Sequence, residues 1–129
     1  MTEAQAGPLA STDLATLEAT LLPSLERHHL RLLAHCLRTL QQVAGSRWGP
    51  LPARPALVAW VAQQGGAAAD PGFQQAFLTQ LERGALQLQT LATSRGCDPL
   101  ALDISDLIVW AEAEARARLN LANPAPPPG

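Results

Sequence analysis

The 129-residue chain contains no lysine and no tyrosine, few charges and only two cysteines. Charged residues make up 16% of the chain, whereas ordinary domains contain about 25%. The nine basic residues are all arginines, and the formal net charge is −2, which argues against a nucleic-acid partner because such domains carry a crowded basic face. Two cysteines form at most one bridge, so a secreted disulfide framework is not expected either.

Long hydrophobic runs are missing as well. The longest unbroken apolar run, Ala56 to Ala62, has seven residues, whereas a membrane-spanning helix needs about 20. The first basic residue is Arg27, and acidic residues precede it, so the chain lacks the positively charged start of a secretory signal. These features predict a cytoplasmic protein without a membrane span.

The chain does contain a helical repeat of apolar residues in its first half. Positions three, four or seven apart are occupied by Leu14, Leu17, Leu21, Leu25, Leu32, Cys36, Leu40 and Val43. Pro23 falls inside this stripe, where it removes a backbone hydrogen bond. Because the stripe stays in phase across Pro23, we expect one long bent element ending at Gly45; a short turn at Pro23 is the alternative.

The second half carries equally clear helix signals. Pro55 suits the first turn of a short helix. Asp70 followed by Pro71 is typical of an N-cap and first helical residue, and Gly96 is expected just after the end of that later helix. Gly84 lies on the apolar stripe of this later helix, which favours a close helix crossing or a Trp ring lying over it. The last helix is expected to begin near Asp103 or Ser105, with inner positions Ile104, Ile108, Ala111, Ala115 and Leu119.

No segment alternates like a strand, so the sequence predicts an all-α, single-domain bundle of four or five helices with short antiparallel connections. We assign residues 12–121 to the bundle domain. Residues 1–11 are expected to form a flexible segment, and residues 122–129 a disordered proline-rich tail. In the connection over residues 45–54, Trp48 and Leu51 are expected to fold back over the core.

Candidate contact residues for a protein partner lie mainly on one helical face. The segment from residue 23 to residue 54 holds five arginines and one glutamate, and the expected polar stripe runs along its helix. The stripe has two interpretations. It is either a solvated surface or a docking surface, whose partner would be an acidic protein or a second copy of this chain. The candidate contacts are Arg27, Arg31, His35 and Arg38, with Trp110 on the last helix.

A ligand-binding bundle is the alternative. His29 and Cys36 are expected to point toward the core, where either residue, or His35, would bind a tetrapyrrole or a metal ion. The simpler interpretation is a buried histidine bonded to a carbonyl and a cysteine packed as a small apolar group. His35 and Cys36 diverge by about 100° on a helix and do not pair as base and nucleophile. We find no catalytic motif and expect no enzyme, no cofactor and no metal site.

Two segments resemble small all-helical proteins of cyanobacteria. They are LERHHLRLLAHCLRTLQ (25–41) and DPLALDISDLIVWAEAEARARL (98–119). The resemblance covers about a third of the chain and implies a cytoplasmic accessory protein of a photosynthetic cell that serves a larger assembly. It assigns no functional residue. The leading hypothesis is therefore a non-catalytic interaction or assembly factor.

Overall fold

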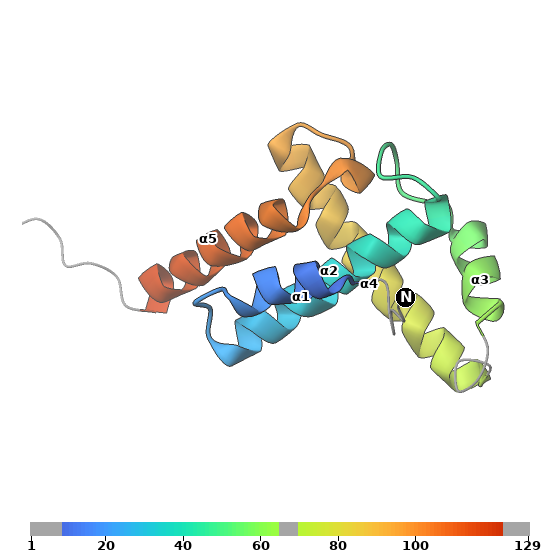
Figure 1. Ribbon diagram of the computed structural model, residues 1–129, viewed down its shortest axis with the longest axis horizontal. Helices are drawn as coiled ribbons and strands as arrows, with labels where there is room; N and C mark the ends of the chain where they lie inside the picture. Colours follow the sequence, from blue (N-terminus) through green and yellow to red (C-terminus); the bar gives the residue numbers. More distant parts are fainter. Residues whose placement is uncertain (1–8, 65–69, 123–129) are drawn as a thin grey trace, which may run out of the picture.

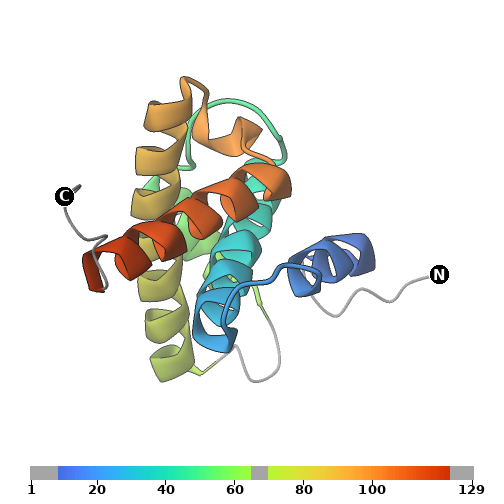
Figure 2. The ribbon, with the colours of Figure 1, turned by 90° about the vertical axis from the view of Figure 1, so that its left-hand side faces the viewer.

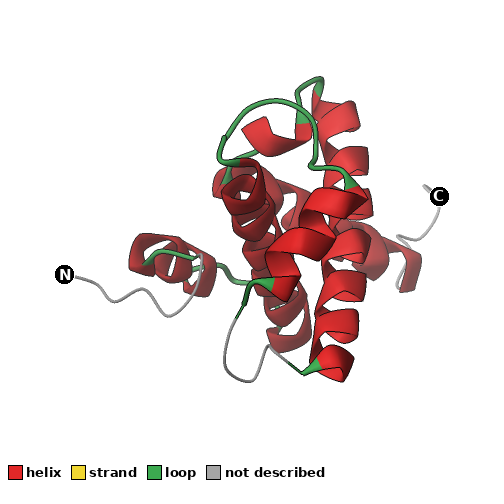
Figure 3. Ribbon diagram, turned by 90° about the vertical axis from the view of Figure 1, so that its right-hand side faces the viewer, coloured by secondary structure: helices red, strands yellow, loops and turns green. Residues whose placement is uncertain are grey.

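The computed structural model describes residues 9–64 and 70–122, and helices alone make up the regular structure of this part of the chain (Figures 1 and 3). The elements are α1 (Ser11–Glu18), α2 (Ser24–Ala44), α3 (Arg54–Ala62), α4 (Pro71–Arg95), a short 3-10 helix η2 (Pro99–Ala101) and α5 (Ile104–Ala122). The expected all-α bundle is confirmed. No helix in the described ranges is both long and apolar enough to cross a bilayer.

Pro23 breaks the first helical segment instead of bending it. Helix α1 ends at Glu18, and Pro23 caps the start of α2, where its carbonyl accepts a hydrogen bond from the Arg27 amide at 2.9 Å. The chain reverses in between, so α1 lies alongside α2 (Figure 1). The continuous element expected from the sequence is therefore wrong, because the missing amide and the ring of Pro23 favour a helix start over a helix interior.

Helix α2 is the central helix, and α1, α3, α4 and α5 all contact it. Its buried apolar residues are Leu30, Leu33, Ala34, Cys36, Leu37 and Leu40. The predicted inner stripe is out of phase at the start of the helix, since Leu25 is 62% exposed and His29 is exposed as well. Because four helices pack around α2, its buried face is wider than the single narrow stripe that the sequence predicted.

Helices α2 and α4 cross closely at Cys36 and Gly84. A Cβ atom built on Gly84 would lie 2.6 Å from the Cys36 sulfur, far inside ordinary van der Waals contact. The absence of a side chain at Gly84 therefore lets the two helices approach each other. This is the close crossing that the sequence predicted as one of two reasons for a glycine on the apolar stripe.

Local signals at the helix ends are confirmed. Gly45 and Gly96 end α2 and α4 in the left-handed conformation, with φ of 67° and 70°, which glycine adopts without steric cost. The Asp70 side chain accepts a hydrogen bond from the Phe73 amide at 2.9 Å at the start of α4. The short helix expected after Pro55 is α3, which begins one residue earlier, at Arg54.

The connection between α2 and α3 differs from the expectation. Leu51 packs against the core, but Trp48 is 75% exposed. The Ser46 hydroxyl bonds to the backbone of Trp48, and the Gly49 carbonyl accepts a hydrogen bond from the Leu100 amide at 3.3 Å. The loop is thus held by its backbone, and the Trp48 ring is not needed to cover the core.

Both chain ends were expected to be loose. Residues 1–8 and 123–129 lie outside the described residues, as do Gly65 and Gly66. The first described residue, Leu9, is buried in the core. The domain boundaries expected at residues 11 and 122 stay predictions.

Candidate functional site

A groove of about 700 Å³ lies between α2, α4 and α5. Helix α5 crosses the face that α2 and α4 present, so it forms one wall of the groove while α4 forms the other (Figure 2). The lining is largely apolar, and its apolar side chains belong to Leu30, Leu32, Leu33, Cys36, Leu86, Trp110 and Ala111. We name this feature the α4–α5 groove.

The groove continues past Trp110 into a smaller hollow of about 210 Å³. Leu86 and Trp110 line both parts, and Gln87 and Thr90 complete the smaller one. Leu86 is 72% exposed, and Leu32 is exposed as well. Large apolar side chains that gather around one concave surface mark an interaction site more often than scattered exposed ones do.

The floor of the groove is formed at the crossing of α2 and α4. The Cys36 thiol donates a weak hydrogen bond to the Gln80 carbonyl at 3.7 Å, and the Gln80 amide approaches the sulfur at 3.9 Å. Burial raises the pKa of Cys36. The thiol therefore keeps its proton at neutral pH and packs as a small apolar group, which disfavours metal ligation or nucleophilic attack because both need the thiolate.

Charged side chains surround the apolar lining. Glu26 of α2 and Arg118 of α5 form an ion pair at 3.8 Å. Arg83 of α4 and Glu114 of α5 also line the groove, on its two opposite walls, and neither forms an ion pair with another described residue. The groove therefore offers one unpaired charge of each sign.

Three of the residues singled out in the sequence meet in this groove, namely His29, Cys36 and Trp110. His29 and Cys36 were candidates for ligand binding, whereas Trp110 was a candidate for partner contact. His29 is exposed and Cys36 is buried at the floor. The expectation that His29 is a core residue is wrong, because the exposed start of α2 extends past its position.

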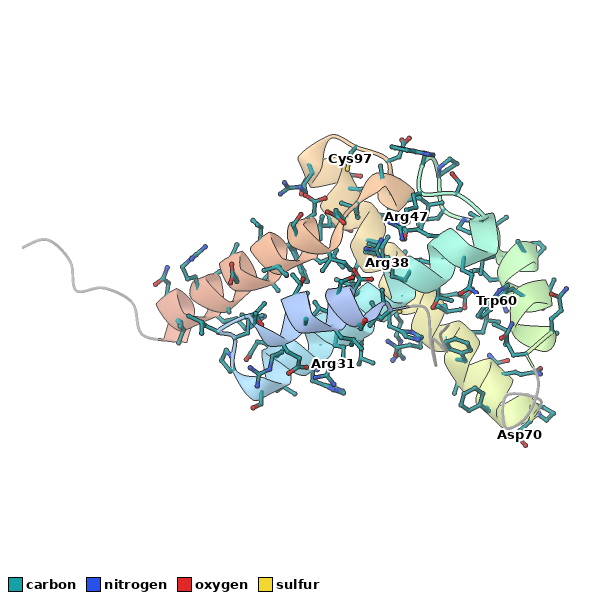
Figure 4. All side chains as sticks on the ribbon, viewed as in Figure 1. Arg31, Arg38, Arg47, Trp60, Asp70 and Cys97 are labelled. Atoms are coloured by element: carbon teal, nitrogen blue, oxygen red, sulfur yellow. The ribbon has the colours of Figure 1, made fainter. Side chains whose placement is uncertain are left out.

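Arg31 and Arg38 of the expected arginine stripe both lie on α2 (Figure 4), but the stripe does not form one exposed surface. Arg27 is partly buried, and Arg31 pairs with Glu18 of α1. Arg38 is only 8% exposed, so the expectation that it lies on a solvated face is wrong. The reason is α1, which folds back over this part of α2.

Arg38 is the centre of a buried polar network. Its guanidinium donates two hydrogen bonds to the Asp13 carboxylate, at 3.0 and 3.2 Å, and one to the Gln41 side chain at 3.0 Å. Gln41 in turn donates to the Leu100 carbonyl at 2.9 Å, and Asp103 lies 3.8 Å from Arg38. The hydrogen bonds from Arg38 lower the pKa of Asp13. The network ties α1, η2 and the start of α5 to α2.

His35 lies outside the groove, in an aromatic cluster between α2, α3 and α4. Its ring centroid is 6.5 Å from that of Phe77, which also contacts Trp60 and Phe73. Burial lowers the pKa of His35. His35 is therefore separated from His29 and Cys36, and the described residues contain no group of three His, Cys, Asp or Glu side chains that could hold a metal ion.

The sequence reasoning missed Leu32, Leu86, Arg83 and Glu114 as residues of one site. Gly84 was the one signal in the sequence for this groove. A glycine on an apolar helix face indicates a close helix crossing, and the side chains that flank such a crossing line a hollow beside it. The position of α5 across that crossing could not be predicted from the sequence, because it depends on packing between distant segments.

Comparison with known proteins gives one match. No curated protein and no solved structure matches the chain. Residues 9–118 match the model of a defined family, which the resemblance to small cyanobacterial proteins did not specify. The matched region extends from two residues before α1 to the last turns of α5 and includes every residue of the groove. The chain therefore belongs to the family described as NDH complex assembly factor CRR9.

Proposed function

We propose that this protein is a non-catalytic assembly factor for an NDH complex and that it acts by docking through the α4–α5 groove. The family to which the chain belongs supports the assembly role. The groove supports docking, because its exposed Leu86 and partly buried Trp110 leave apolar surface that a partner would remove from water. This juxtaposition of Leu86 and Trp110 carries the proposal.

The alternative is a bundle that binds a tetrapyrrole or a metal ion through His29, Cys36 or His35. In its favour, His29 and Cys36 both line a groove of the size used for small ligands. Against it, the protonated thiol of Cys36 is a poor ligand, and His35 lies in a different part of the molecule. Metal analysis and visible absorption of protein purified from its native host separate the two functions.

The test of the proposed function is genetic complementation in the native host. We expect a strain without this protein to accumulate less NDH complex on native gels, and the wild-type chain to restore it. Leu86→Arg should restore it poorly, because a charge would enter the apolar groove. Leu119 was expected on the inner side of the last helix, but it is 66% exposed on α5 and lies outside the groove, so Leu119→Arg is the matched control. Normal accumulation without the protein would reject the assembly role.

Location and oligomeric state stay predictions. We propose that the protein acts in the cytoplasm, as expected from the sequence, and cell fractionation tests this. A second copy of the chain also remains a candidate partner. Light scattering of the purified protein, combined with the Leu86→Arg variant, shows whether the groove mediates self-association.

A further inference from the structure

We infer that the occupant of the α4–α5 groove is an amphipathic α-helix of a partner protein, with an acidic side chain facing Arg83 and a basic side chain facing Glu114. This inference rests on the proposed function, because it names the chemistry of the segment that the assembly factor would hold. It is carried by the shape of the groove, by its lining and by its two unpaired charges.

The shape of the groove fits a helix. Its walls are the helices α4 and α5, and its floor is the crossing of α2 with α4. A helix packs into such a hollow as it packs in a protein core, with its side-chain ridges between those of its neighbours. A two-turn helix is about 11 Å long and about 10 Å across. The groove of about 700 Å³ therefore accepts the apolar face of a helix of this size.

Other modes of peptide binding lack their usual structural basis. Strand addition needs an exposed sheet edge, and residues 9–64 and 70–122 contain no strand. Proline-rich segments bind surfaces lined by several Tyr, Trp or Phe rings, whereas Trp110 is the one such residue among the described residues that line this groove. Helix-in-groove binding uses apolar anchors three, four or seven residues apart, and the neighbouring Leu86, Leu32 and Trp110 provide the surface that such anchors require.

The charges define the orientation of the occupant. Glu26 and Arg118 neutralise each other, which leaves Arg83 on the α4 wall and Glu114 on the α5 wall. A bound helix covers its apolar face and brings its two flanks close to these walls. Opposite charges on the flanks would then pair with Arg83 and Glu114, and the reverse arrangement would place like charges together.

This chain is a poor source of the occupant. Outside the groove, no described helix carries two exposed large apolar side chains at the three-, four- or seven-residue spacing of an amphipathic face. On α5, for example, the exposed Val109 and Leu119 are ten residues apart, with no exposed large apolar side chain between them. The exposed Leu25 and Leu32 of α2 are seven residues apart, but Leu32 lines the groove itself. A second copy would therefore have to use its own groove to supply an apolar stripe. This favours a different protein as the partner.

The experiment is site-specific photo-crosslinking in the native host, with the full chain carrying a photoreactive amino acid in place of Leu86. We expect a crosslink to a subunit of the NDH complex, within a segment whose apolar residues recur at helical spacing. The same amino acid in place of Leu119 is the control and should not crosslink to that segment. Crosslinking to a second copy, to residues 123–129, to an extended or proline-rich segment, or to no protein would overturn the inference.

Charge reversal tests the orientation. We expect Arg83→Glu to lower the yield of the Leu86 crosslink about tenfold, as for the loss of one favourable charge contact. Arg116→Glu is the matched control, because Arg116 is exposed on α5 and lies outside the groove. Equal yields for the two variants would refute the assigned role of Arg83. If NDH complex accumulation still depends on the protein while these crosslinks fail, the assembly role stands and the helix occupant does not.

Discussion

Gly84→Ala tests the close crossing of α2 and α4 most directly. The new Cβ atom would lie 2.6 Å from the sulfur and 2.8 Å from the Cβ atom of Cys36, whereas ordinary contacts begin near 3.4 Å. The helices must therefore separate by roughly 1 Å, and overpacking of this kind costs about 1–3 kcal/mol. Alanine is also a better helix former than glycine by about 1 kcal/mol, which offsets part of the cost. We expect a net loss of up to about 2 kcal/mol of unfolding free energy.

The measurement is urea unfolding followed by circular dichroism, in a double-mutant cycle with Cys36→Gly. Removing the Cys36 side chain removes both close contacts, so the double variant should be more stable than the sum of the single changes predicts by the full overpacking cost, about 1–3 kcal/mol. For a chain of this length each kcal/mol corresponds to a melting shift of about 4 °C. If Gly84→Ala instead stabilised the protein, as expected for a solvent-facing glycine, the assigned crossing would be refuted.

Three further predictions follow from the buried groups. Because burial lowers the pKa of His35 in the folded state, the free energy of unfolding should be highest above about pH 6.5 and should fall as the pH drops toward the folded-state pKa. Urea unfolding between about pH 8 and pH 5 measures this fall, and the His35→Gln variant should not show it. Asp13→Asn should cost about 3 kcal/mol because Arg38 keeps its buried charge without the carboxylate, and thermal melting measures the loss. With a thiol reagent, Cys97 should react in the native protein and Cys36 only on unfolding.

Features decided within one helical turn could be predicted from the sequence. The Asp70 cap, the αL glycines Gly45 and Gly96, and the all-helical class depend on neighbouring residues, and all are confirmed. The close helix crossing at Gly84 could also be predicted, because a glycine on an apolar helix face has few packing explanations. These local rules do not say which helices meet.

Features decided by distant segments could not be predicted. The sequence placed Arg38 on a polar helix face. Its partner Asp13 lies in α1, 25 positions earlier, and no residue near Arg38 in the sequence indicates that the two would pair. In the same way, His29 and Leu25 share the spacing of the apolar stripe, yet both side chains are exposed at the start of α2. The sequence suggested His29, Cys36 and Trp110 for a pocket between helices, but it did not show which other residues line that pocket, because this depends on the path of α5.

In the proposed docking mode, Arg38 would act through the segment that leads into α5. It bonds to Gln41, which holds the Leu100 carbonyl, so the segment that leads into α5 is attached to α2. Gly84 lets α2 and α4 approach each other at the floor of the groove, and Gln41 holds the turn that precedes α5, the helix that carries Trp110. The floor and the start of one wall are thus held by contacts within the chain. A preformed groove lowers the entropic cost of binding, so in the proposed docking mode Arg38 would contribute to affinity without touching the partner.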